Sequence, residues 1–349
     1  MKKHKILLAR ILLPAFFILL FLAAICQQYG RQKTEQPLSL TSFKLNTVVR
    51  VTLYDSSDQE ILERAMDICE EYEDIFSRTK ESSELFRLNH QELPKDKEGF
   101  YSLSKPLAQV IEAGLTYAEL SDGAFDITIA PVSSLWDFTS SENSLPEPED
   151  IQAALSLVDY KNVSLSGSRL RFEKEGMQLD LGAAAKGYIA DQIKEYLLSQ
   201  GVTSALIDLG GNVLCVGSHP DGTPFETGIQ KPFSDRGEQI LTLGVENKSV
   251  VTSGVYERCF EKDGILYHHI LNPRTGYPYD NGLLSVTIIS DSSLDGDCLS
   301  TACFSLGLEK GMELVNSLPD IQAVFITEDG QFHLSDGFEE SVTVVSKKS

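Results

Sequence analysis

Four segments of the chain combine glycine, aspartate, lysine, threonine and histidine in patterns that suit phosphate and metal chemistry. In the segment Leu179–Tyr188, an expected strand ends at Asp180, and small residues then open a helix with Lys186 on its first turn. Backbone N–H groups and the helix dipole at such a turn can bind a phosphate. The spacing of a Walker A loop is absent, so the alternative is an ordinary strand-to-helix turn.

A candidate metal pair lies in the segment Asp295–Ala302. Asp297 and Thr301 are four residues apart at an expected helix start, so their side chains share one helix face. Both side chains offer oxygen atoms, which suit Mg²⁺ rather than zinc or copper. The alternative interpretation is an Asp that stabilises a helix N-terminus, next to an ordinary helical Thr.

The other two segments carry turn signals next to candidate ligands. The first covers 122–131 and is followed by the only tryptophan, Trp136, which fits a stacking wall as well as plain core. In the other, His269 is expected to end a strand before a turn that carries the basic Arg274. His269 is therefore a candidate phosphate ligand, whereas the neighbouring His268 is expected to be structural.

The elements that must position these segments are a mixture of helices and short strands. Capping patterns predict helices that begin near Ser57-x-x-Glu60 and at Ser104, and a surface loop is expected over 142–150. Further helices are expected over 184–201 and 297–316. Strands are expected over 49–53, 163–165, 170–172, 178–181, 205–208, 213–216, 240–245, 250–252, 269–271, 285–289, 323–326 and 332–334. This mixture predicts an α+β fold with a mostly antiparallel sheet and flanking helices, and no composition break divides it.

The composition is that of a globular protein and excludes some classes of partner. The 349 residues are 42% hydrophobic and 23% charged. The formal net charge of −21 argues against nucleic acid or an anionic membrane surface as the main partner. The six cysteines include no Cys-x-x-C and no Cys/His spacing typical of zinc sites, so buried single thiols are expected.

The N-terminus has the layout of an export signal. Basic residues precede an uncharged run from Ile11 to Ile25, which is short for a membrane span and suits a secretory segment. Leu22 to Cys26 resembles a bacterial lipobox, so residues 1–26 are expected to be a lipoprotein signal, or alternatively an uncleaved N-terminal anchor. Residues 27–42 are expected to be a polar tether, and the folded domain is expected over 43–345.

Taken together and in order, the chemical segments resemble the ApbE family, the FAD:protein FMN transferases. The family pattern runs through G-x-x-D-[IV]-T-x-x-P, D-L-G-x-x-x-K-G-Y, L-G-G-[DN], T-S-G-x-Y-x-R, H-I-x-[DN]-P-x-T-G-x-P and A-D-x-x-[ST]-T. The matching residues are Gly123–Pro131, Asp180–Tyr188, Leu209–Asn212, Thr252–Arg258, His269–Pro278 and Asp297–Thr301. The ordered match covers about residues 43–345, which is far more specific than any single motif.

The resemblance implies one T-fold-like domain that binds FAD and Mg²⁺. The groups expected to hold the metal are the carbonyl of Ala183 and the side chains of Asp297 and Thr301. The side chains expected to contact FAD are Asp126, Asp180, Lys186 and His269. Enzymes of this family move the FMN half of FAD onto a Thr hydroxyl of a partner protein and release AMP. The candidate catalytic residues are His269 and Asp297, either of which could be the base.

The resemblance also implies what the protein acts on, and the N-terminal layout implies where it acts. Acceptors are expected to be exported redox-pump or electron-transfer proteins, and this chain would be exported and anchored to the outer face of the cytoplasmic membrane. No Ser/Thr-Gly-Ala-Thr acceptor segment occurs in the sequence, so transfer would take place in trans. The alternatives are an Mg²⁺-dependent FAD pyrophosphatase that gives FMN and AMP, and a non-catalytic exported FAD-binding lipoprotein.

Overall fold

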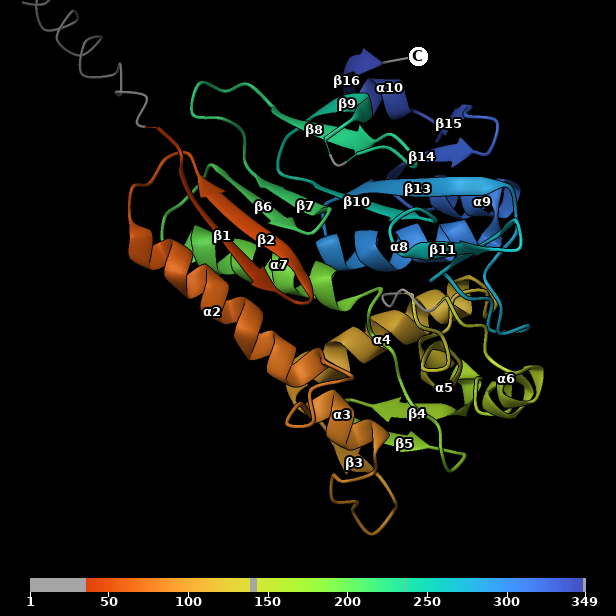
Figure 1. Ribbon diagram of the computed structural model, residues 1–349. Helices are drawn as coiled ribbons and strands as arrows, with labels where there is room; N and C mark the ends of the chain where they lie inside the picture. The colour runs from red at the N-terminus through yellow and green to blue at the C-terminus, as the bar shows by residue number, and fades with distance from the viewer. Residues whose placement is uncertain (1–35, 139–142, 236, 348–349) are drawn as a thin grey trace, which may run out of the picture. The chain divides into compact units, whose positions relative to one another are not determined.

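The computed structural model describes residues 36–138, 143–235 and 237–347 (Figure 1). The expected signal or anchor segment 1–26 and residues 27–35 of the expected tether lie outside the described residues. Residues 38–42 of that tether belong to the first strand, in which Leu38 and Leu40 pack against the main core. From Leu38 onward the chain forms one unit, and no helix within the described ranges is long and apolar enough to cross a membrane.

The fold is built on an eight-stranded sheet with the strand order β1-β2-β6-β7-β10-β13-β14-β15. All pairings between the described strands are antiparallel, which confirms the α+β prediction. The strands of this sheet are β1 (Leu38–Lys44), β2 (Thr47–Leu53), β6 (Ala205–Leu209), β7 (Asn212–Val216), β10 (Ser249–Gly254), β13 (Leu283–Ser290), β14 (Gln322–Thr327) and β15 (Phe332–Leu334).

Side chains that alternate along these strands give the sheet two apolar faces. On β13, Val286 and Ile288 belong to the core shared with the large helices, whereas Ile289 belongs to a second core on the opposite face. A three-stranded sheet covers that second face and is drawn above the main sheet in Figure 1. Its strands are β8 (Phe225–Gln230), β9 (Gln239–Val245) and β16 (Thr343–Lys347).

Helices α7 (Ala185–Ser199) and α8 (Ser293–Leu306) pack against each other below the main sheet (Figure 1). The single helix predicted over 297–316 is wrong, because Gly307 has a φ of 79° and separates α8 from α9 (Leu308–Ser317). The start of α8 is capped by Ser292, so Asp297 lies in the second turn rather than at the helix start. The other α-helices of the described residues are α2 (Gln59–Phe76), α3 (Glu84–Asn89), α4 (Lys105–Leu120), α5 (Ala130–Ser133), α6 (Pro148–Leu155) and α10 (Phe338–Ser341), and two short 3-10 helices span Ile127–Ile129 and Tyr160–Asn162.

One of two predicted helix starts is confirmed, and the other helix start and one predicted loop differ from the structure. Ser104 caps α4 as predicted, with its side chain accepting a hydrogen bond from the N–H of Leu107. The cap of α2 is Asp58 rather than Ser57. The loop predicted over 142–150 already contains the start of α6, where Pro148 occupies the first turn, a position that proline favours.

The strand predicted over 178–181 is not formed. The side-chain amide of Asn89 instead donates to the carbonyl of Leu179 at 2.9 Å and accepts from its N–H at 2.8 Å. One amide therefore satisfies the backbone groups that a neighbouring strand would have satisfied. The strand predicted over 269–271 is reduced to an isolated bridge between Leu271 and Pro278. The small sheets are β3 (Tyr101–Ser102) with β5 (Arg169–Phe172) and β4 (Val163–Ser166), and β11 (Cys259–Lys262) with β12 (Ile265–His268).

Candidate active site

A close contact between the start of α7 and the second turn of α8 forms the centre of the site. The N–H of Gly187 donates to Oδ2 of Asp297 at 2.9 Å. A Cβ atom at position 187 would lie 2.2 Å from the carbonyl oxygen of Ser293, so only glycine fits there without a shift of the backbone. This close approach brings the candidate anion turn and the candidate metal pair together.

The three groups expected to hold a metal are all hard oxygen donors. Thr301 lies one turn beyond Asp297 on α8, and its hydroxyl is 2.9 Å from Oγ of Ser253 in β10. Ala183 lies just before the first turn of α7. The bond from Gly187 occupies only part of the acceptor capacity of the Asp297 carboxylate. A carboxylate, a hydroxyl and a backbone carbonyl fit the chemistry of Mg²⁺. The described part of the chain holds no cluster of three or more His, Cys, Asp or Glu side chains suited to a metal.

Asp297 is a buried carboxylate in a partly compensated environment. It is 5% exposed, and this burial raises the pKa of its carboxyl group above the usual value. The Lys186 ammonium group, the N–H of Gly187 and the Asn212 side chain lower that pKa and favour the carboxylate. Burial has the larger effect, so a cation beside this carboxylate would offset a desolvation cost that the protein alone leaves uncompensated.

His269 follows β12 and is neutral in the folded protein. Its backbone N–H donates to the carbonyl of Arg258 at 3.1 Å, and its ring Nδ1 is buried without a hydrogen-bond partner among the described residues. Burial is the main cause that lowers the pKa of His269 to about 3, and the nearby charges of Arg258, His268 and Lys186 contribute to that value. An unpartnered buried nitrogen flanked by cationic groups fits a site for an anionic ligand that also carries a hydrogen-bond donor.

His268 differs from its neighbour in having fully used ring nitrogens. It is 3% exposed; its Nε2 lies 2.9 Å from the carbonyl oxygen of Tyr279, and its Nδ1 accepts from the N–H of Ile270 at 3.3 Å. These contacts confirm the structural role predicted for His268.

The Asp180 carboxylate is held by groups from three parts of the chain. Its Oδ1 accepts from the N–H of Gly182 at 2.9 Å, and its Oδ2 accepts from the hydroxyl of Ser133 at 2.9 Å. Nε of Arg78 lies 3.4 Å from the same Oδ2. The N–H of Asp180 also donates to the carbonyl of Ile127 at 2.8 Å, which joins the first chemical segment to the second. Sequence reasoning missed Arg78 and Ser133, because neither lies in a motif with a recognisable spacing.

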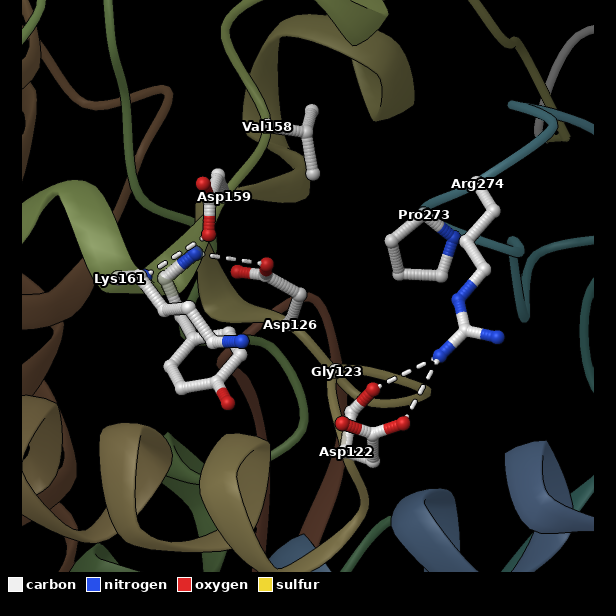
Figure 2. A pocket seen from close by; sticks show the side chains of 9 residues that line it. Asp122, Gly123, Asp126, Val158, Asp159, Lys161, Pro273 and Arg274 are labelled. Carbon is white, nitrogen blue, oxygen red and sulfur yellow. Dashed lines mark hydrogen bonds and ion pairs between the residues drawn. The ribbon is translucent and has the colours of Figure 1, made fainter.

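Asp126 organises a loop beside a cavity. Its Oδ1 accepts from the N–H and the hydroxyl of Thr128 at 2.8 and 2.7 Å, and its Oδ2 accepts from the N–H of Tyr160 at 2.9 Å. These three bonds hold the loop in place, so the Asp126 carboxylate shapes the wall of the site. The adjoining cavity measures about 250 Å³ and is shown in Figure 2. It is lined by Asp122, Gly123, Asp126, Val158, Asp159, Tyr160, Lys161, Pro273 and Arg274.

The turn after His269 closes the other side of this cavity. Nη2 of Arg274 donates to the backbone carbonyl of Asp122 at 2.8 Å, so the third chemical segment is tied to the first (Figure 2). Indole Nε1 of Trp136 donates to the carbonyl of Gly276 in the same turn at 3.0 Å. Trp136 is 6% exposed and belongs to an aromatic core cluster, so of its two predicted roles the structure supports packing. The four segments therefore meet in one continuous region.

Comparison with known proteins gives a consistent set of relatives. The sequence profile of the ApbE family matches residues 45–325. A FAD:protein FMN transferase of Klebsiella pneumoniae is 38% identical over 301 residues, covering 85% of this chain and 91% of that protein. One of Treponema pallidum is 32% identical over 91% of this chain and 92% of that protein. The crystal structure of the ApbE protein from Thermotoga maritima superposes with a TM-score of 0.78 at 33% identity, covering 87% and 99%.

Proposed function

This chain belongs to the ApbE family, and we propose that it transfers the FMN moiety of FAD to a Thr hydroxyl of a partner protein and releases AMP. The observation that carries this proposal is the contact of Gly187 with Asp297. It joins the helix turn that carries Lys186 to the oxygen groups expected to hold a metal. A protein that only bound FAD would not need both beside one unpartnered histidine nitrogen.

The reaction exchanges the phosphoanhydride bond of FAD for a phosphoester bond to the acceptor. The acceptor oxygen forms a bond to the phosphorus of the FMN half, and the bond from that phosphorus to the bridging oxygen breaks. AMP leaves with the bridging oxygen, and the hydroxyl proton passes to a base. Lys186, on the first turn of α7, would stabilise the negative charge that develops on the phosphoryl oxygens, whereas the N–H groups of Ala185 and Gly187 already donate to Leu181 and Asp297.

We assign the base to His269 rather than Asp297. The ring of His269 is neutral at pH 7, and its Nδ1 has no hydrogen-bond partner among the described residues, so the ring can accept a proton. The anionic pyrophosphate of FAD would counter the charges of Arg258 and Lys186 and thereby raise the pKa of His269 toward a useful value. Asp297 has the less suitable position, since a carboxylate that ligates a cation is a poorer base.

Magnesium is proposed as the metal, held by the carbonyl of Ala183 and the side chains of Asp297 and Thr301. When bound, it would neutralise charge on the pyrophosphate and orient the leaving group. The protein's own contribution is to bury the Asp297 carboxylate and to anchor it to the N–H of Gly187. Asp126 and Asp180 shape the adjoining wall, toward which we place the rest of the FAD molecule.

The test is to incubate the protein with FAD, Mg²⁺ and an exported redox protein from the same organism. We expect the acceptor band to gain flavin fluorescence that survives SDS and acid, and its mass to rise by one FMN less water. AMP should appear in equal amount. AMP and free FMN without labelled acceptor would instead establish the FAD pyrophosphatase, and bound, unchanged FAD would establish the non-catalytic binder.

We also propose that the mature protein is exported and held at the outer face of the cytoplasmic membrane. The support is the basic-then-apolar N-terminus that ends at Cys26, together with the expectation that the acceptors are exported. Cell fractionation should find the chain in the membrane fraction, and Cys26→Ala should release it or change its mobility if Cys26 carries lipid. Unchanged membrane association and mobility in Cys26→Ala would leave only the uncleaved anchor, and a cytosolic chain would exclude export.

A further inference from the structure

A carboxylate outside the chemical segments caps the helix that carries the metal-type ligands. Asp191 lies on α7, one turn beyond Gly187. Its Oδ1 accepts from the N–H of Ser293 at 2.9 Å, and its Oδ2 accepts from the N–H of Leu294 at 3.0 Å and from the hydroxyl of Ser292 at 3.2 Å. These are the cap and the first two residues of α8, so Asp191 satisfies backbone donors that a helix start leaves without internal partners.

Ser292, Ser293 and Leu294 are thereby fixed to α7 rather than only to their own helix. Ser293 is held from a second direction, since its hydroxyl donates to Oδ1 of Asn212 at 2.8 Å and accepts from Oγ of Ser249 at 2.9 Å. Ser293 is fully buried, so none of these bonds can be replaced by bulk water without opening the structure.

The same two helices meet again one turn further along. Gly187 and Asp191 are four residues apart and therefore lie on one face of α7. The first reaches Asp297, and the second reaches the first turn of α8. Two anchor points about one helical turn apart fix both the position of α8 along its axis and its rotation about that axis. The rotation determines where Asp297 and Thr301 point.

We propose that Asp191 is a positioning residue for the metal site, acting through the first turn of α8 on Asp297 and Thr301. This inference rests on the proposed function, because it assumes that these two side chains hold the metal used in flavin transfer. Groups that orient metal ligands from outside the coordination shell change metal affinity by about 10- to 100-fold when they are altered. Asp191 acts through a helix turn, which places the expected effect near the lower end of that range.

The decisive variant is Asp191→Asn, which keeps the size of the side chain and removes its charge. We expect the Mn²⁺ concentration for half-saturation of the FAD-loaded protein, measured by electron paramagnetic resonance without acceptor, to rise about tenfold. The Mg²⁺ concentration for half-maximal transfer should rise by the same factor, and the rate at saturating Mg²⁺ should recover. FAD binding in EDTA should stay within about twofold of wild type, since the affected ligands serve the metal. Asp191→Glu, which keeps the charge, should raise both the half-saturating Mn²⁺ concentration and the half-maximal Mg²⁺ concentration by about threefold.

The matched control is Glu195→Gln, one turn further along the same helix. Glu195 is exposed and bonds within α7 to Gln192, so this variant loses the same charge without touching α8. An unchanged metal requirement in folded Asp191→Asn, or a lower maximal rate that no amount of metal restores, would overturn the proposal. If Asp191→Asn does not fold, Asp191→Glu decides: a metal requirement equal to wild type refutes the positioning role. Failure of the wild-type protein to transfer FMN would count against the proposed function instead.

Discussion

His269 gives the FAD-free protein a specific response to acid. Its pKa in the folded protein is about 3, whereas the usual value for histidine is 6.5. Between these two values the unfolded chain binds a proton that the folded protein excludes, so the free energy of unfolding falls as the pH falls through 6.5 toward 3. A pH of 5 lies about 1.5 units below the pKa of histidine in the unfolded chain. At about 1.4 kcal/mol per unit, the free energy of unfolding is therefore lower by about 2 kcal/mol at pH 5 than at neutral pH.

The perturbation is His269→Gln, which removes this proton from both states. Between pH 7 and pH 5, the wild-type protein should lose about 2 kcal/mol more stability than the variant, as measured by urea unfolding of FAD-free, EDTA-treated protein. Buried carboxyl groups such as Asp126 and Asp297 have raised pKa values and act in the opposite direction, but they are common to both proteins and cancel. The exposed His90, changed to Gln, controls for the loss of a histidine. Equal losses in wild type and His269→Gln would refute the burial argument.

The remaining predictions concern the metal and the contact between α7 and α8. Asp297→Ala should lower the rate of FMN transfer at millimolar Mg²⁺ by at least about a hundredfold, measured by in-gel flavin fluorescence. Acceptor labelling by this variant at the wild-type level would contradict the assignment of Asp297 as a metal ligand. Excess EDTA should stop transfer by the wild-type protein, and added Mg²⁺ should restore it; full activity in EDTA would exclude the metal. Gly187→Ala should cost about 1–3 kcal/mol in thermal unfolding and also slow transfer, because its Cβ meets the carbonyl of Ser293, whereas the control Ser199→Ala should do neither.

The sequence predicted best those features that are determined by residues close together in the chain. The Ser104 cap of α4 is a local hydrogen bond, and the hairpin of β14 and β15 follows from alternation around an Asp-Gly turn. The chemical segments are also local, since each contains its own glycines, acids and turn residues. Their order along the chain allowed one family to be named from this single sequence.

What could not be predicted depends on pairs of residues far apart in the chain. Asn89 and Leu179 replace an expected strand pairing, and Arg78 reaches Asp180, in each case across about ninety to a hundred residues. Neither contact has a spacing that a single sequence could reveal. A side-chain amide that pairs with an extended backbone leaves the same apolar pattern as a strand, so the error over 178–181 has a physical cause.

The misplaced start of α8 shows why such errors concentrate near the site. Its first turn is Ser-Leu-Asp-Gly, a run of polar and small residues that is typical of a loop, and Asp297 resembles a helix cap. The helix starts earlier because Asp191, about a hundred residues away in the chain, accepts its first N–H groups. The buried Ser293 is polar for the same reason, since it bonds to neighbouring elements instead of facing water. Buried polar contacts of this kind hold a side chain such as Asp297 in one orientation, and they remove the amphipathic pattern on which helix prediction depends. The hidden boundary of α8 and the positioning of Asp297 therefore have a common origin.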